Sequence, residues 1–324
     1  MPCTSSRWAR RVAPAMLLPT LVLALSACAL PTWTPGGAAS TTDVASPGVN
    51  IEPQTAGTAV VGLVTDYGQC DDAEAKVEAR VRAWNPDVVV TTGDNTQGVD
   101  GCVPYTESVA AYYGHFLNDP RGPRFFPATG NHDYEDNGQP APGGKSTAYT
   151  DFFDYLPTNA DAARRWYSAR VGPVVFYMLD SDAPEPDLAL QRTWLRTSLA
   201  AAPDGVWKVV LFHRPPFTSG PHDPFTPMSP SAGWDYKGWG VDIVLNGHQH
   251  VFEDVIVDGM HYVTTGVGGR VLERDCPTTR AAGSQTCIKG PGAVRLKVTE
   301  SSLKLQYRLL DAPDEKAYEL ELTR

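Results

Sequence analysis

The chain has 324 residues, of which 42% are hydrophobic and 20% charged, and its formal net charge is −10 at pH 7. This composition is typical of a globular protein with a sizeable core, and the length fits one large domain or two small ones. The acidic balance argues against a protein that binds nucleic acid through its phosphates, although bound cations can make a single site locally positive.

The first residues have the pattern of an export signal. Three arginines precede an apolar run, residues 12–27, which two prolines interrupt and which is too short for a transmembrane helix. The run ends in Leu25-Ser26-Ala27-Cys28, which resembles the lipobox of bacterial lipoproteins, where cleavage precedes the cysteine and its thiol receives a lipid. We therefore expect residues 1–27 to be a lipoprotein signal peptide and Cys28 to be the lipidation site. The protein would then be an exported cell-envelope lipoprotein that contacts the membrane only through its lipid anchor. An ordinary secretory signal, and hence a secreted protein, is the alternative.

Residues 28–57 are rich in Pro, Ser, Thr, Ala and Gly and show no periodic apolar pattern. They are expected to form a flexible tether, which leaves residues 58–324 for the folded domain. Four cysteines remain in that domain, and an even number in an exported chain indicates two disulfides. We predict Cys70–Cys102, beyond two neighbouring strands, and Cys276–Cys287, which would close a short surface loop.

Buried strands alternate with helices from Ala59 onward. Asp71 and Asp72 are placed to cap a helix, and Val77, Val81 and Trp84 would share one of its faces. A second helix is expected at 188–200. Short apolar runs predict strands at 60–64, 88–90, 125–126, 174–179, 209–212 and 243–245. Alternating residues predict antiparallel strands at 254–258, 261–265, 293–298 and 303–308. This order indicates sheet layers flanked by helices.

Five of the apolar runs end directly in potential metal ligands. These are Asp66, Asp94, Asn131, His213 and the pair His248 and His250. In open α/β sheets the site lies beyond the carboxyl ends of the strands, so these side chains are expected to converge. Glycines at 93, 130 and 247 fit tight turns and close backbone approach. Each motif alone usually has a structural explanation, but five at strand ends in this order predict a metal site.

The motifs Asp66-Tyr67-Gly68, Gly93-Asp94, Gly130-Asn131-His132-Asp133, His213 and Gly247-His248-Gln249-His250 resemble those of the calcineurin-like metallophosphoesterase superfamily. The resemblance spans about residues 59–324 and is strongest to the purple acid phosphatase branch, whose first block is also Asp-x-Gly. It implies an α/β fold, a four-layer α-β-β-α sandwich of two mixed β-sheets flanked by helices. It also implies hydrolysis of phosphate esters with two metal ions.

The resemblance further implies a ligand set. One metal would be held by Asp66, Asp94 and His250, and the other by Asp94, Asn131, His213 and His248, with Asp94 bridging both. Purple acid phosphatases have an iron-binding tyrosine at the position of Gln97, and a glutamine can offer only a neutral oxygen or leave that place open. Mixed nitrogen and oxygen ligands fit iron, zinc or manganese alike.

Water activated by the two cations would attack phosphorus in line. His132 is expected to donate a proton to the leaving oxygen, and His222 to bind phosphate or share that transfer. Asp133 would orient the turn or a ligand. The expected substrates are small-molecule phosphate monoesters. A phosphodiesterase with the same metals and a non-catalytic surface lipoprotein are the rival interpretations, and the sequence carries no signal for the oligomeric state.

Overall fold

The computed structural model describes residues 48–99, 101–136, 139–140, 145–158, 164–270, 275–310 and 317–324. The predicted signal peptide, Cys28 and most of the tether lie outside the described residues, so they stay predictions. Among the described residues, no helix has the length and apolar character needed to cross a membrane.

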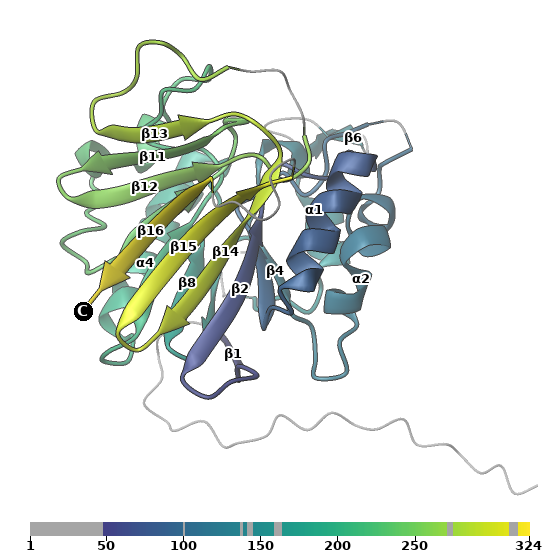
Figure 1. Ribbon diagram of the computed structural model, residues 1–324, viewed down its shortest axis with the longest axis horizontal. Coiled ribbons are helices and arrows are strands. Elements are labelled where there is room, and N and C mark those ends of the chain that lie inside the picture. Colours follow the sequence, from purple (N-terminus) through teal and green to yellow (C-terminus); the bar gives the residue numbers. More distant parts are fainter. Residues whose placement is uncertain are drawn as a thin grey trace, which may run out of the picture. The chain divides into compact units, whose positions relative to one another are not determined.

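Two large sheets form the centre of the domain (Figure 1). The eight-stranded sheet has the order β1 (Gly48–Ile51), β7 (Tyr167–Val171), β8 (Val174–Met178), β9 (Trp207–Leu211), β10 (Ile243–Asn246), β12 (Met260–Thr265), β11 (Phe252–Val257), β13 (Ser284–Ile288). The six-stranded sheet has the order β16 (Tyr318–Thr323), β15 (Ser302–Leu309), β14 (Gly292–Thr299), β2 (Thr58–Val64), β3 (Val88–Thr91), β4 (Phe125–Pro127). A small hairpin joins β5 (Glu135–Asp136) and β6 (Gln139–Pro140).

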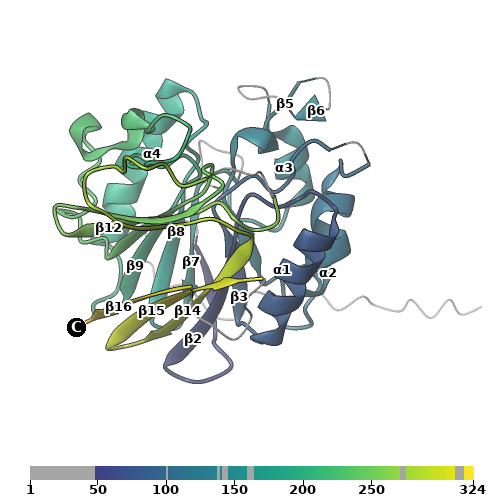
Figure 2. The same ribbon diagram turned by 45° about the horizontal axis from the view of Figure 1, so that its top comes forward.

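Helices cover the outer faces of both sheets (Figure 2). The helices α1 (Asp72–Ala83) and α2 (Ala111–Leu117) lie against the six-stranded sheet, where α1 contacts β14 and α2 contacts β4. The helix α4 (Glu185–Ala200) packs on the eight-stranded sheet, and the short α3 (Thr147–Phe152) adds to the core beside β4. Both sheets mix parallel and antiparallel pairs. The predicted four-layer sandwich is therefore confirmed.

The central strands are buried on both faces, which explains their uninterrupted apolar sequences. In β8, Val174, Phe176 and Met178 belong to the core that both sheets share. Val175 and Tyr177 alternate with them and pack with α4 in a second core on the outer face. Because successive strand residues point to opposite faces, one short strand contributes to both cores and fixes its own register.

The helix α1 begins where the sequence predicts a cap. The Asp71 carboxylate accepts hydrogen bonds of 3.0 Å from the backbone N–H groups of Ala73 and Glu74. Such a cap stabilises a helix by about 1 kcal/mol. Val77 and Val81, one turn apart, are fully buried against the sheet, and each contributes roughly 1.5–3 kcal/mol of burial.

The structure differs from the sequence prediction at the end of the expected tether. Residues 48–51 form β1, which pairs in parallel with β7 and is itself the edge strand of the eight-stranded sheet. Val49 and Ile51 pack partly against the core, so this segment gains both a hydrogen-bonded ladder and apolar burial. A four-residue strand between Pro- and Gly-rich segments has too weak a pattern to be recognised alone. The ordered domain thus begins before residue 58.

Both predicted disulfides are present. Cys70 pairs with Cys102, and Cys276 pairs with Cys287, with Cα–Cα distances of 5.7 and 5.8 Å. The first joins the segments that follow β2 and β3, which are parallel neighbours. It therefore ties together two of the loops that carry predicted metal ligands.

Candidate dinuclear metal centre

The predicted ligands follow strands that are parallel neighbours in the two sheets. Asp66 follows β2, Asp94 follows β3 and Asn131 follows β4 in the six-stranded sheet. His213 follows β9 and His248 follows β10 in the eight-stranded sheet. Because parallel strands end at the same edge, each sheet presents its ligands along one edge.

Three of these residues have a left-handed backbone that only glycine adopts readily. The φ angle is 52° at Asp66, 52° at Asp94 and 67° at His248. Each such residue costs of order 1–3 kcal/mol and persists only where the surrounding structure enforces it. Here the Asp66 N–H donates to the Gly93 carbonyl at 3.2 Å, and the His248 N–H donates to Asp66 Oδ2 at 3.0 Å. These bonds fix the ligand-bearing turns relative to one another.

Four ligand atoms converge around the ring of His213. His213 Nε2 lies 3.1 Å from Asn131 Oδ1, 3.2 Å from His248 Nδ1 and 3.3 Å from Asp94 Oδ1. His213 is fully buried, and the other three residues are nearly so. One proton on His213 Nε2 cannot satisfy two oxygens and a second imidazole nitrogen together, whereas a metal ion accepts all four lone pairs.

The second nitrogen of His213 fixes which tautomer the ring adopts. His213 Nδ1 lies 3.1 Å from the Thr92 carbonyl oxygen, to which only a protonated nitrogen can donate. This contact holds the ring plane and leaves Nε2 facing Asn131 and Asp94. A backbone acceptor of this kind is the usual partner of a metal-binding histidine.

A second group of ligand atoms surrounds Asp66. Its Oδ2 accepts hydrogen bonds from Thr65 Oγ1 at 2.8 Å and from the His248 N–H. Its Oδ1 is buried without a hydrogen-bond partner among the described residues, and lies 3.3 Å from His250 Nε2. A buried carboxylate oxygen without a donor is costly unless a cation meets it. Asp66, Asp94 and His213 each offer one ligand atom, and these three atoms lie within 4.8 Å of one another, which is close enough for them to bind one cation together.

The electrostatics of the cluster also favour cations. Burial alone would lower the pKa of His213, but the carboxylates of Asp94 and Asp66 raise it to about 9. Burial opposes ionisation of Asp66, yet the charges on His213 and His250 hold its pKa well below the usual range. Burial and the neighbouring charge of His213 lower the pKa of His248.

Asp133 organises the turns without touching the ligand side chains. Its carboxylate accepts hydrogen bonds from the backbone N–H groups of Gly130, at 2.8 Å, and Asn95, at 3.1 Å. The Asn95 side chain and the Tyr105 hydroxyl also donate to it, at 2.9 Å each. Burial, followed by repulsion from Asp94, raises the pKa of Asp133 to about 7. The residue thus holds together the segments on either side of two predicted ligands.

The two predicted non-ligand histidines also lie beside the cluster. The His132 N–H donates to Asp94 Oδ1 at 2.9 Å, and its ring keeps 31% of its surface exposed. The ring of His222 lies 4.5 Å from that of His248, centroid to centroid. Gln249 holds the backbone of His222 by accepting from its N–H at 3.1 Å and donating to its carbonyl at 2.7 Å. Both rings therefore border the site.

Sequence reasoning missed two arginines at the site. Arg214, directly after His213, donates from Nε to Asp182 Oδ1 at 2.7 Å, and its Nη1 lies 3.2 Å from His248 Nε2. Arg270 donates its backbone N–H to the Asp66 carbonyl at 3.1 Å and its guanidinium to Gln97 Oε1. The available signals were the adjacency of Arg214 to a ligand and the glycine-rich run that ends at Arg270.

The family model for calcineurin-like phosphoesterases matches residues 41–252 of the sequence. The chain belongs to this family. Comparison of the sequence with curated proteins gives no match.

Solved structures show the same fold. Purple acid phosphatase PPD1 from yellow lupin has a TM-score of 0.65 and 16% identity, over 84% of this chain and 55% of the lupin chain. This chain thus spans about half the length of the lupin protein. GAP50, the anchor in the inner membrane complex of Plasmodium, has a TM-score of 0.63 and 14% identity, over 82% of this chain and 89% of its own. Members of the family typically bind two metal ions, which agrees with the candidate ligands of this chain.

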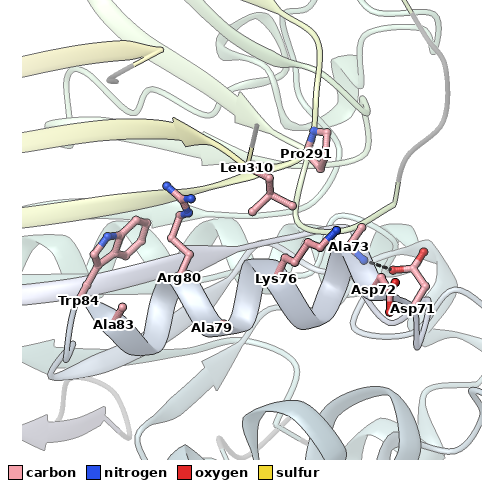
Figure 3. Close-up of a pocket in the computed structure, with 10 residues that line it drawn as sticks. All are labelled: Asp71, Asp72, Ala73, Lys76, Ala79, Arg80, Ala83, Trp84, Pro291 and Leu310. Atoms are coloured by element: carbon pink, nitrogen blue, oxygen red, sulfur yellow. Dashed lines mark hydrogen bonds between the residues drawn. The ribbon is translucent and has the colours of Figure 1, made fainter. Parts of the chain in front are cut away.

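A separate groove of about 1120 Å³ runs along α1 (Figure 3). Lys76, Arg80 and Trp84 line it from the helix, and Pro291 and Leu310 border it from the other side. None of the predicted metal ligands lines this groove. It is therefore distinct from the metal centre.

Proposed function

We propose that the chain hydrolyses small-molecule phosphate monoesters with two metal ions. The observation that carries this proposal is the convergence of lone pairs on His213 Nε2 and Asp66 Oδ1 from loops of both sheets. The fold likeness to the lupin purple acid phosphatase supports a phosphatase within this family.

The predicted ligands form two sets that share Asp94. Asp66, Asp94 and His250 would hold one ion, and Asp94, Asn131, His213 and His248 the other. When bound, such a pair neutralises phosphate charge and supplies a nucleophile near neutral pH. The donor types fit iron, zinc or manganese, and elemental analysis of the purified protein would identify which of these metals is bound.

The chain itself supplies proton transfer and orientation. His132 is held over Asp94 by its backbone N–H and keeps an exposed ring edge, which places it to protonate a leaving oxygen. His222, whose ring lies 4.5 Å from that of His248, would bind phosphate or share that transfer. If His132 is the donor, His132→Ala should impair hydrolysis of β-glycerophosphate much more than that of p-nitrophenyl phosphate. An alkoxide needs protonation to leave, whereas nitrophenolate does not. Equal losses on both substrates would contradict this role.

Substitution of two predicted metal ligands tests metal binding. Asn131→Ala and His248→Ala should each lower metal content, measured by elemental analysis, and reduce hydrolysis of p-nitrophenyl phosphate. His115→Ala is the control, because His115 lies on α2 beside Glu78 and away from the cluster. Full metal content and activity in both ligand variants would refute the enzyme proposal.

The rival functions have separate tests. A diesterase would hydrolyse bis-p-nitrophenyl phosphate faster than p-nitrophenyl phosphate at equal metal loading. GAP50 is described as an anchor in an inner membrane complex, so a surface role is a rival function for this chain. The retained donor set favours an enzyme here, and absence of turnover on both esters with metal bound would favour the surface role.

We also propose that the protein is an exported lipoprotein, anchored to the membrane through Cys28. The two disulfides support export, because such bonds persist in oxidising compartments. Labelling cells with a radioactive fatty acid should mark the wild type and not Cys28→Ala, which should move to the soluble fraction. A labelled or membrane-bound variant would exclude Cys28 as the only anchor and favour another signal.

A further inference from the structure

Gln97 and Arg270 meet beside Asp66, although they are far apart in sequence. The Arg270 backbone N–H donates to the Asp66 carbonyl at 3.1 Å, and the Gln97 N–H donates to the Gly68 carbonyl at 3.2 Å. Their side chains then join, with the Arg270 guanidinium donating to Gln97 Oε1. Both residues are therefore fixed to the loop that carries Asp66, and Gln97 also belongs to the loop that carries Asp94.

Each of the two side chains keeps a buried donor without an acceptor. Gln97 is only 6% exposed, and its Nε2 has no hydrogen-bond partner among the described residues. Arg270 Nε is buried and likewise lacks a partner there. Buried donors are nearly always satisfied, so two of them side by side indicate a ligand rich in acceptor oxygens.

Arg270 also differs from two other arginines near the site in the charge of its side-chain partner. Arg214 pairs with Asp182 at 2.7 Å, and Arg165 pairs with Asp180 at 2.6 Å. Within the described part of the chain, no carboxylate lies within the 4.0 Å ion-pair distance of Arg270. Its side-chain partner is the neutral Gln97. A neutral acceptor orients the guanidinium and leaves its full charge available to an anion.

Arg270 also lies beside the metal ligands, because its backbone N–H is bonded to the Asp66 carbonyl and its guanidinium contacts Gln97 in the loop that carries Asp94. The ring of His132 is the partly exposed edge of the cluster, where an ester would enter.

We propose that Arg270, held in place by Gln97, binds non-bridging oxygens of the substrate phosphate and makes the site favour doubly charged monoesters over singly charged diesters. This inference rests on the proposed phosphoesterase function. A fixed guanidinium offers paired donors that match phosphate geometry. Its attraction grows with the charge of the ligand, which separates a dianion from a monoanion.

The test measures phosphate binding as well as turnover. In Arg270→Gln, the Kd of inorganic phosphate from calorimetry and the KM for p-nitrophenyl phosphate should rise roughly 10- to 100-fold, as expected for a charge-assisted contact. The ratio of kcat/KM for the monoester to that for bis-p-nitrophenyl phosphate should fall roughly tenfold. Arg270→Lys should recover part of both effects, and metal content should equal that of the wild type.

Gln97→Ala tests the positioning role. It should weaken phosphate binding less than Arg270→Gln, and the double variant should be no worse than Arg270→Gln alone, because both changes remove one contact. Arg196→Gln is the matched control, since it removes one positive charge from an exposed position on α4.

Two results would overturn the inference. The first is an unchanged phosphate Kd and KM in Arg270→Gln, and the second is a loss of bound metal, which would make Arg270 a structural residue. If the wild type hydrolyses neither ester, the proposed function fails by itself. The phosphate Kd of Arg270→Gln then still decides whether Arg270 binds the anion.

Discussion

Gly247→Ala tests directly whether close packing around Asp66 builds the metal site. A Cβ at position 247 would lie 2.4 Å from Thr65 Oγ1, 2.6 Å from Asp66 Oδ2 and 2.9 Å from Thr92 Oγ1. Ordinary contacts begin at 3.4 Å, so the closest atom must move by 3.4 − 2.4 = 1.0 Å. The φ of Gly247 lies outside the left-handed region, so the penalty is steric alone. We expect a loss of about 1–3 kcal/mol of stability from overpacking.

The larger effect should fall on metal binding. Thr65 donates to Asp66 Oδ2 at 2.8 Å and Thr92 donates to Thr65 at 2.6 Å, so moving either hydroxyl removes one of the two hydrogen bonds that orient this oxygen, the other being from the His248 N–H. Disturbing such a supporting shell typically lowers metal affinity 10- to 100-fold. Calorimetric titration with Mn²⁺ or Zn²⁺ measures this affinity, and thermal unfolding of metal-free protein measures the stability.

Gly114→Ala provides the comparison, because Gly114 lies in α2 with no atom within 4 Å of a new Cβ. That variant should be neutral or more stable by up to about 1 kcal/mol. A Gly247→Ala protein that binds metal as tightly as Gly114→Ala would refute the reasoning about Asp66.

Three further predictions concern spectrum, pH and cross-linking. Iron-loaded protein should show no tyrosinate-to-iron absorption band, because Gln97 is not a phenol and the Tyr67 hydroxyl donates to Asn95 Oδ1 at 2.7 Å. Visible spectroscopy measures this band, and its presence would show that a tyrosine binds the metal. Burial raises the pKa of Glu74 to about 7 from the ordinary 4.5, so its stabilising contribution is complete below pH 4.5 and is lost as the pH rises through 7. The Tm of the wild type should therefore fall relative to Glu74→Gln over that window, and parallel Tm curves would contradict the assignment. Replacing Cys276 and Cys287 together by serine should cost about 3 kcal/mol for a loop with a sequence separation of 11, measured by urea unfolding. No change in the unfolding midpoint would show that this loop is already ordered in the unfolded chain.

The elements that the sequence predicts are those with strong local patterns. The strands β8, β9 and β10 are apolar on both faces because they lie between two cores, so their runs stand out. By contrast, β13 is half-exposed and polar, and β1 has only four residues. The sequence of each resembles that of a loop, and both become strands only because a neighbouring strand supplies hydrogen bonds. The strand β16 alternates regularly in exposure, so its signal was present in the sequence and was missed.

The same distinction holds within the site. Asp66, Asp94, Asn131, His213 and His248 are predictable because each directly follows its own strand, and the sheet then brings them together. The contact between Gln97 and Arg270 spans 173 residues and depends on how two loops meet. No local pattern encodes such a pair. The sequence identified Gln97 only as a departure from a family motif, and its partner required the structure.

Arg214 has a charged side-chain partner and Arg270 has a neutral one, and this difference explains how Gln97 affects the charge at the site. The Arg214 guanidinium is bound by the carboxylate of Asp182, which cancels its charge, so Arg214 chiefly orients the groups around His248. With two divalent ions and an attacking hydroxide, the carboxylates of Asp66 and Asp94 would leave the centre with a formal charge of +4 − 2 − 1 = +1, one less than the charge of a phosphate monoester dianion. Arg270 adds one more positive charge only because Gln97 carries none. An acid at position 97 would keep the guanidinium in place and remove that charge, so its main effect would be on the choice between dianionic and monoanionic esters.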